Sequence, residues 1–187
     1  MSLINVKELV KNELDRVTQP MRDEMKEIDE QIAKLKEKER DIALSAAREG
    51  HKDLVNEMVE RGVDDYEEIA WCAAEGGHKD LVNDMIEKGG IEVEDYDEIA
   101  MCAARGGHKD LVEDMIERGA NDYNEIAWCA AYGGHKDIVD DMIRRGADNY
   151  NEIARWAERG GHKDIVNEMI QLDKQRSNAW YSTQGHY

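Results

Sequence analysis

Apolar and polar residues alternate along this chain with the period of short amphipathic helices, and the pattern recurs. Within residues 42–172, two adjacent apolar residues are followed four positions later by two more, a spacing that places all four on one helix face. Two consecutive sets are Ile69, Ala70, Ala73 and Ala74, then Leu81, Val82, Met85 and Ile86. The pattern predicts pairs of short helices, the first of each pair carrying a flat, alanine-rich face.

The pairs follow one another at a fixed period. A histidine preceded by Gly and followed by Lys-Asp recurs at spacings of 27, 30, 27 and 27 residues, at His51, His78, His108, His135 and His162. The longer spacing comes from three extra residues within "KGGIEVEDY", between the end of one unit and the start of the next. An insertion tolerated at that point indicates a loop.

Each predicted helix has recognisable ends. A short polar residue precedes a Glu by three positions where first helices begin, as in a capping box, at Asp65 and Glu68, Asp95 and Glu98, Asp122 and Glu125, and Asn149 and Glu152. A Gly pair such as Gly76-Gly77 ends the first helix, and a basic residue before Gly ends the second, as in Lys88-Gly89.

A unit of two helices of about ten residues each cannot bury its own apolar faces, so neighbouring units must cover them. The sequence therefore predicts an all-α fold, an α-solenoid of five helix-turn-helix repeats of period 27 over residues 41–172. The remaining residues, 173–187, form a tail that is polar apart from Trp180, Tyr181 and Tyr187.

Residues 1–40 carry a separate apolar pattern. Val6, Val10, Leu14 and Val17 form one stripe, and Met21, Met25, Ile28, Ile32 and Leu35 form another, with Pro20 between them. Two readings compete: a helical hairpin that turns at Pro20 and caps the stack, or a coiled coil that pairs two chains as a homodimer. We favour the hairpin, because two heptads are few for a self-sufficient coiled coil.

Composition narrows the class of partner. The formal net charge of −18 repels a phosphate backbone, so we expect no nucleic-acid partner. No run of 18 apolar residues exists, and "MSLINVKELVKNELDRV" has charges where a signal peptide needs an apolar segment. Cys72, Cys102 and Cys129 occupy one equivalent place in three repeats, which is unlike a disulfide framework. We expect a cytoplasmic, reducing location without membrane insertion.

The segments "GHKDLVEDMIERGA" and "EIAWCAAYGGH" resemble the ankyrin repeat, in which Gly-His opens the second helix and Gly-Ala follows it. The Thr-Pro-Leu-His signature is missing, and the period of 27 is shorter than the ankyrin period because the residues of the β-hairpin finger are absent. The chain resembles the divergent, shortened ankyrin-like repeats of giant DNA viruses. That resemblance implies protein binding without the usual finger contacts.

The recurring His and Cys residues raise the question of metal or catalytic chemistry. Zinc ligands lie about 2.0–2.1 Å from the ion, whereas stacked helices are about 8–10 Å apart, so successive histidines are badly placed to share one metal. A catalytic group is usually singular, and a motif copied five times indicates architecture. We therefore expect each His to tie the inter-helix turn by hydrogen bonds, and we predict no metal, no cofactor and no enzymatic activity.

Two columns of residues vary while their surroundings repeat. Aligned positions of the first helices read Leu44, Trp71, Met101, Trp128 and Arg155, and four residues later Arg48, Glu75, Arg105, Tyr132 and Arg159. Residues at i and i+4 share a helix face, and large aromatic and Arg side chains favour protein interfaces. The alternative is that Trp71 and Trp128 pack between units. The invariant Tyr66, Tyr96, Tyr123 and Tyr150 belong to the scaffold.

These patterns predict a protein–protein interaction module that presents a concave repeat face to a protein partner. The predicted binding residues are Trp71, Met101, Arg105, Trp128, Tyr132 and Arg155. The alternative function is a structural or assembly protein, virion-associated in one version, that self-associates through residues 1–40. The mass in solution separates the two.

Overall fold

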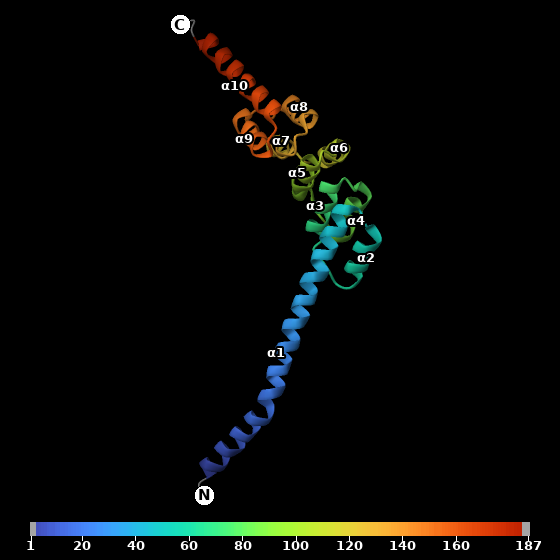
Figure 1. Ribbon diagram of the computed structural model, residues 1–187, viewed down its shortest axis with the longest axis vertical. Helices are drawn as coiled ribbons and strands as arrows, with labels where there is room; N and C mark the ends of the chain where they lie inside the picture. Colours follow the sequence, from blue (N-terminus) through green and yellow to red (C-terminus); the bar gives the residue numbers. More distant parts are fainter. Residues whose placement is uncertain (1–2, 185–187) are drawn as a thin grey trace. The chain divides into compact units, whose positions relative to one another are not determined.

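The structure is a computed structural model that describes the backbone of residues 3–184 and the side chains of residues 6–93 and 95–178. The described residues form ten α-helices and one short 3₁₀ helix, with no β-strand among them (Figure 1). The elements are α1 (Leu3–Glu49), α2 (Lys52–Glu60), α3 (Tyr66–Gly76), α4 (Lys79–Gly89), η1 (Val93–Asp95), α5 (Tyr96–Gly106), α6 (Lys109–Arg118), α7 (Tyr123–Gly133), α8 (Lys136–Arg145), α9 (Tyr150–Gly160) and α10 (Lys163–Gln184).

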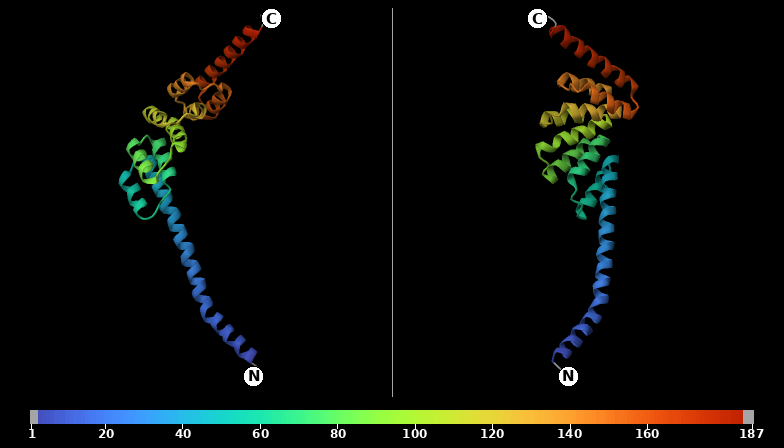
Figure 2. Two further views of the ribbon diagram at one scale, coloured as in Figure 1. Left: turned by 180° about the vertical axis from the view of Figure 1, so that it is seen from behind. Right: turned by 90° about the vertical axis from the view of Figure 1, so that its left-hand side faces the viewer.

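Contacts divide the chain into two units, Met1–Asp41 and Ile42–Tyr187. In the first unit the predicted hairpin is wrong, because α1 is one helix with Pro20 inside it. Figure 2 shows a bend in the dark-blue part of α1, as a proline in a helix produces. Residues 1–49 contain no glycine that would let the chain reverse, and Gln19 bonds Asp23 across the proline at 2.8 Å.

The second unit is the predicted stack of helix pairs, shown edge-on in Figure 2. The first helices α3, α5, α7 and α9 pack directly against one another, whereas neighbouring second helices lie farther apart. The small Ala side chains of the first helices permit this close approach. The stack is therefore concave on the side of its first helices.

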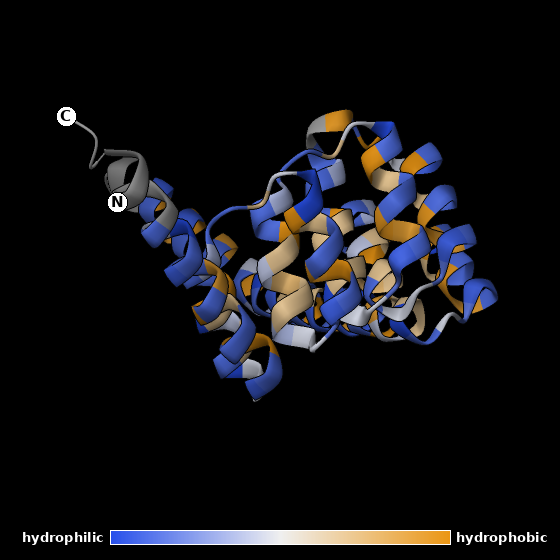
Figure 3. Cartoon of the chain, turned by 90° about the horizontal axis from the view of Figure 1, so that it is seen from above, coloured by the Kyte–Doolittle hydropathy of each residue, from blue (hydrophilic) through white to orange (hydrophobic). Residues whose placement is uncertain are grey.

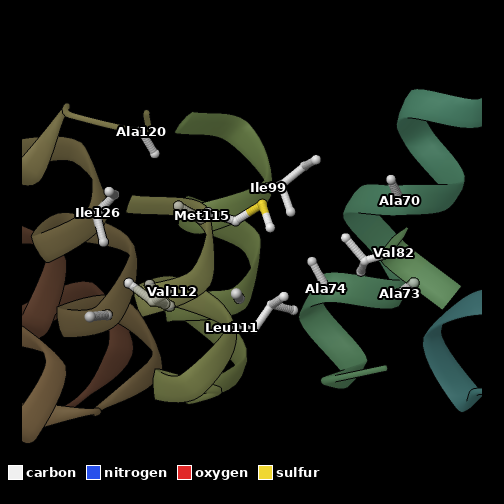
Figure 4. Close-up of a cluster of buried hydrophobic side chains, with 14 of the residues drawn as sticks. Ala70, Ala73, Ala74, Val82, Ile99, Leu111, Val112, Met115, Ala120 and Ile126 are labelled. Atoms are coloured by element: carbon white, nitrogen blue, oxygen red, sulfur yellow. The ribbon is translucent and has the colours of Figure 1, made fainter. Parts of the chain in front are cut away.

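Buried apolar residues run continuously through the stack. Along each helix they alternate with hydrophilic positions, which Figure 3 shows as orange and blue segments. Ile99 and Met115 are fully buried and lie against each other in the interior (Figure 4). Equivalent residues of other repeats, such as Ile126 and Met142, are also fully buried. Each repeat thus completes the core of its neighbours.

Four of the five repeated histidines hold adjacent units together, whereas the sequence predicted that each would tie the inter-helix turn. In four repeats the His Nε2 lies within hydrogen-bond distance of a carbonyl oxygen in the preceding first helix. The pairs are His78 with Arg48 at 3.0 Å, His108 with Glu75 at 2.9 Å, His135 with Arg105 at 3.1 Å and His162 with Tyr132 at 3.1 Å. The bond satisfies a carbonyl near a helix end, where intrahelical donors are missing. His51, in the first repeat, instead lies 3.2 Å from Glu49 Oε2.

The glycines before each histidine allow this contact. A Cβ on Gly106 would lie 2.1 Å from the Glu75 carbonyl oxygen, so only glycine fits there. The following Gly107 has φ of 83°, and a Cβ on it would lie 2.4 Å from the His135 ring. At the first repeat, Glu49 occupies the position equivalent to Gly106. The Gly-Gly-His sequence is therefore the inter-repeat joint.

The predicted capping boxes are present only in part. Asp122 and Asn149 accept from the backbone N–H groups of Glu125 and Glu152, whereas Asp65 and Asp95 make no side-chain cap bond. The N–H of Asp122 donates to Asp97 Oδ1 of the preceding repeat at 2.9 Å, so it does not serve a reciprocal box. Asn124 accepts from Asp148 and Asn149 in the same way. Helix starts are thus coupled between repeats.

Ion pairs link the second helices across the wider gap on the outer side of the stack. Lys52 Nζ lies 2.6 Å from Asp84 Oδ2, and Lys136 Nζ lies 2.9 Å from Glu168 Oε2.

The last second helix, α10, does not end near residue 172 as the repeat pattern suggests. It continues to Gln184, so the described part of the predicted tail is helical, and residues 185–187 lie outside the described residues.

Candidate functional site

The concave side of the stack carries a groove of about 690 Å³ that crosses three consecutive first helices. Met101 and Arg105 come from α5, Trp128 and Tyr132 from α7, and Trp156 and Arg159 from α9. Residues four positions apart lie on one helix face, and the joints between repeats align those faces. Glu125 and Cys129 complete the lining. The groove therefore depends on the stacking of repeats.

The groove unites four of the six predicted binding residues: Met101, Arg105, Trp128 and Tyr132. Trp71 does not line it, and its side chain packs half-buried against the apolar core. Arg155 is exposed outside the groove and pairs with Glu152, with Nη1 and Oε1 3.1 Å apart. The predicted columns thus meet in space only over the third, fourth and fifth repeats.

Trp156 and Arg159 line the groove but were not among the predicted site residues. Trp156 occupies the column that holds Cys72, Cys102 and Cys129 in earlier repeats, so the aromatic residue of the fifth repeat is shifted by one position. Comparing single columns misses such a shift. The presence of a third tryptophan on a first helix, after Trp71 and Trp128, was the available signal.

The three residues at the α9 end of the groove form a stacked cluster. The Tyr132 and Trp156 rings meet edge to face, with centroids 6.1 Å apart and planes 82° apart. The Arg159 guanidinium carbon lies 4.7 Å from the centroid of the Trp156 ring, in cation–π geometry. Among the described residues no carboxylate pairs with Arg159, and Tyr132 is 44% exposed. The cluster offers one cationic and two aromatic groups to a ligand.

At the α5 end the charges are mutually satisfied. Glu75 bridges two arginines, with Oε1 3.0 Å from Arg105 Nε and Oε2 3.0 Å from Arg48 Nη2. Within the groove, burial raises the pKa of the Glu125 carboxyl, and the carboxylates of Asp122 and Glu98 raise it further. The groove thus has an arginine paired with a carboxylate at one end, and at the other end an arginine that contacts an indole ring and has no carboxylate partner within the described part of the chain.

The two indoles of the variable column combine packing with incomplete hydrogen bonding. Trp71 and Trp128 are half-buried and contact the apolar core. Their Nε1 donors are enclosed and have no hydrogen-bond partner within the described part of the chain. An enclosed donor without a partner costs about 1–3 kcal/mol, which the buried ring area must offset. Trp128 therefore serves both the scaffold and the groove wall.

The three cysteines are free thiols, all half-buried. Burial raises the pKa of Cys102 to about 12 and that of Cys129 to about 11. Because the thiolate is the reactive form, these cysteines act as small apolar residues at neutral pH. Across the described side chains, no group of three His, Cys, Asp or Glu residues is arranged to hold a metal ion.

Comparisons with known proteins add no identity. No protein-family model matches the chain, and no curated protein matches it. No helix within the described residues has both the length and the apolar character needed to cross a membrane. The groove and the surface of α1 are therefore the features of the chain that bear on its function.

Proposed function

We propose that the chain is an interaction module whose concave groove binds a segment of another protein. The observation that carries this proposal is the groove itself. Five aromatic or arginine side chains gather there from three repeats: Arg105, Trp128, Tyr132, Trp156 and Arg159. Large aromatic and Arg side chains dominate the energetics of protein interfaces.

The variation between repeats supports the same assignment. Residues that join repeats are nearly invariant, as in the Gly-His-Lys-Asp sequence, whereas the two columns that supply Trp128 and Tyr132 to the groove change from each unit to the next. Scaffold positions are constrained by packing, and a binding surface gains specificity from differences along its length. The groove is thus the part of the stack that differs from repeat to repeat.

The charges indicate the chemistry of the partner. The chain as a whole carries a formal charge of −18, yet the groove is lined by Arg105 and Arg159 against a single Glu125. Arg159 is held over Trp156, and its guanidinium has no carboxylate partner among the side chains that the structure describes. A segment that carries a carboxylate beside a large apolar side chain satisfies both features, because the carboxylate pairs with Arg159 while the apolar group covers the aromatic rings.

Selection from a random-peptide library against the full chain tests this proposal. We expect enriched peptides to carry Asp or Glu next to a large apolar residue. The double variant Tyr132→Ser/Arg159→Glu should weaken their binding by about tenfold or more, measured by calorimetry, because it removes an aromatic contact and reverses the charge. Both residues are exposed, so loss of their contacts with Trp156 should lower the free energy of unfolding by only about 1–2 kcal/mol, which leaves the stack folded.

Lys163→Glu is the matched control. It makes the same charge change at an exposed residue of α10 that does not line the groove. We expect it to leave peptide affinity within about twofold of the unsubstituted chain. Peptides that bind the double variant as tightly as the original chain would show that the groove is not the binding surface.

A second candidate function is assembly through self-association of α1, favoured by a continuous apolar stripe on this helix. Val10, Val17 and Met21 are at least 60% exposed, which is unusual for large apolar side chains in a monomer. A structural protein would use this stripe to join copies of the chain, and the groove would then serve the assembled form.

We also propose that the protein works in an intracellular, reducing location. We further propose that its repeats are related to the divergent, shortened ankyrin-like repeats of giant DNA viruses. Three free cysteines support the first proposal. The order of helix, Gly-Gly-His joint and second helix supports the second.

A further inference from the structure

The N-terminal unit is a single helix whose apolar side chains nothing in that unit can cover. Six large apolar side chains of α1 are each between 46% and 63% exposed: Leu14, Met21, Met25, Ile28, Ile32 and Leu35. A lone helix of this kind is marginal in water unless another surface covers its stripe. The spacing and charge pattern of α1 identify what that surface is.

The stripe has the width of a coiled-coil seam. Leu14, Met21, Ile28 and Leu35 recur every seven residues, and Met25 and Ile32 fall between them at the alternating spacing of 4 and 3. From Met21 to Leu35, two apolar positions per heptad make a narrower stripe than the three or four that a helix uses to pack on a globular core, and Thr18 and Glu39 hold the outer seam positions. The pattern therefore favours another helix of the same kind as the occupant.

Charges beside the seam select the orientation of that second helix. In the series that recurs every seven residues, the residue after each apolar member lies at the edge of the seam. These edge residues are Asp15, Arg22, Asp29 and Lys36, and their charges alternate between negative and positive. In an antiparallel pair, the edge residues of one helix face the edge residues of the other, which run in the opposite direction. When Met25 of one helix packs against Ile28 of the other, Asp15 faces Lys36 and Arg22 faces Asp29. Each pair occurs twice, so four opposite-charge pairs form.

Other arrangements are less favourable. In a parallel pair, Glu24 faces Asp29 of the second helix, which is a like-charge pair, and no opposite-charge pair forms along residues 14–39. Shifting the antiparallel register by one heptad in one direction places Asp29 against Asp15 and Arg22 against Arg22 of the other helix. A shift in the other direction places Asp29 against Asp29 and Arg22 against Lys36. Only one register pairs all four edge residues favourably.

Pro20 is compatible with this pairing. It lies immediately before Met21, on the side of the helix away from the seam. Proline has no N–H group, so the carbonyl of Arg16, four residues earlier, has no intrahelical donor. The side chain of Arg16 is 74% exposed. Water can therefore satisfy this carbonyl, and no apolar layer is interrupted.

We propose that two copies of this chain pair through residues 14–39 of α1 as an antiparallel coiled coil, with Arg22 against Asp29 and Asp15 against Lys36 of the other copy. The inference rests on the self-association put forward above as the second candidate function, and it adds the orientation and register. The two helices leave the coil at opposite ends, about 40 Å apart. A dimer of this kind carries two grooves. A partner with two binding segments can occupy both grooves at once, which raises its apparent affinity.

The test uses the full chain and measures the dimer dissociation constant by sedimentation. We expect a species of twice the 21.4 kDa chain mass. Asp29→Arg should weaken the dimer by about tenfold or more, because it turns two attractive contacts with Arg22 into repulsive ones. The double variant Arg22→Asp/Asp29→Arg should restore the original affinity. Glu30→Arg makes the same charge change at an exposed residue outside the seam and should have little effect.

The outcomes separate the two ideas. In a parallel coiled coil Asp29→Arg would face Glu24 and strengthen the dimer, which would overturn the antiparallel register and leave self-association standing. A chain that stays monomeric at all concentrations, with unchanged helical circular dichroism, would overturn both. Failure of the double variant to recover the lost affinity would also contradict the proposed pairing.

Discussion

Replacing Gly106 with alanine is expected to destabilise the repeat stack by about 3 kcal/mol or more. A Cβ at this position would lie 2.1 Å from the backbone oxygen of Glu75 in the preceding repeat, so helices α3 and α5 would have to separate. Their separation also breaks the bond from His108 to the same oxygen. Alanine's better helix propensity recovers only about 1 kcal/mol. Urea unfolding measures the net loss.

The chain contains a natural control for this substitution. Glu49 of α1 occupies the equivalent position in the first repeat, which has no preceding repeat to contact. Glu49→Ala should therefore change the free energy of unfolding by less than about 0.5 kcal/mol. Equal effects of the two substitutions would contradict the inter-repeat joint described above.

Truncating Met115 to alanine is expected to cost about 2–5 kcal/mol. Met115 is fully buried beside Ile99, in the interior shared by the third repeat and its neighbours. The cavity left behind cannot be filled without moving helices from more than one repeat, since the core is continuous along the stack. Thermal or denaturant unfolding measures the loss.

Ile170→Ala provides the comparison. Ile170 is 41% exposed on α10, so its truncation should cost less than about 1 kcal/mol. A loss at Met115 as small as that at Ile170 would mean that the repeats do not share a core.

Local patterns predicted the repeats well because both ends of each helix carry signals. The Gly-Gly-His joint and the paired apolar positions place the helices of the stack within a few residues. The expected N-terminal hairpin is wrong, because a proline does not by itself end a helix. With no glycine nearby and with side-chain bonds spanning the proline, α1 continues through it.

Long-range partners were less predictable. Sequence spacing alone assigned Glu125 to a reciprocal cap with Asp122, whereas the Asp122 N–H donates to Asp97, a residue 25 positions away. The groove shows the same limit. Its arginine and aromatic columns were visible in the sequence, but Trp156 enters it from a neighbouring column, and Trp71 lies outside it. Such details depend on the rotation of each helix within the stack.

Indole N–H resonances of the tryptophans test the central claim, that the groove over α5, α7 and α9 binds a partner segment. The probe is a peptide enriched in the library selection, titrated into the full chain, with resonances assigned by Trp→Phe variants. Peptide binding in the groove should shift the resonances of Trp128 and Trp156, while that of Trp71 stays in place. A shift at Trp71 with Trp128 and Trp156 unchanged would contradict it.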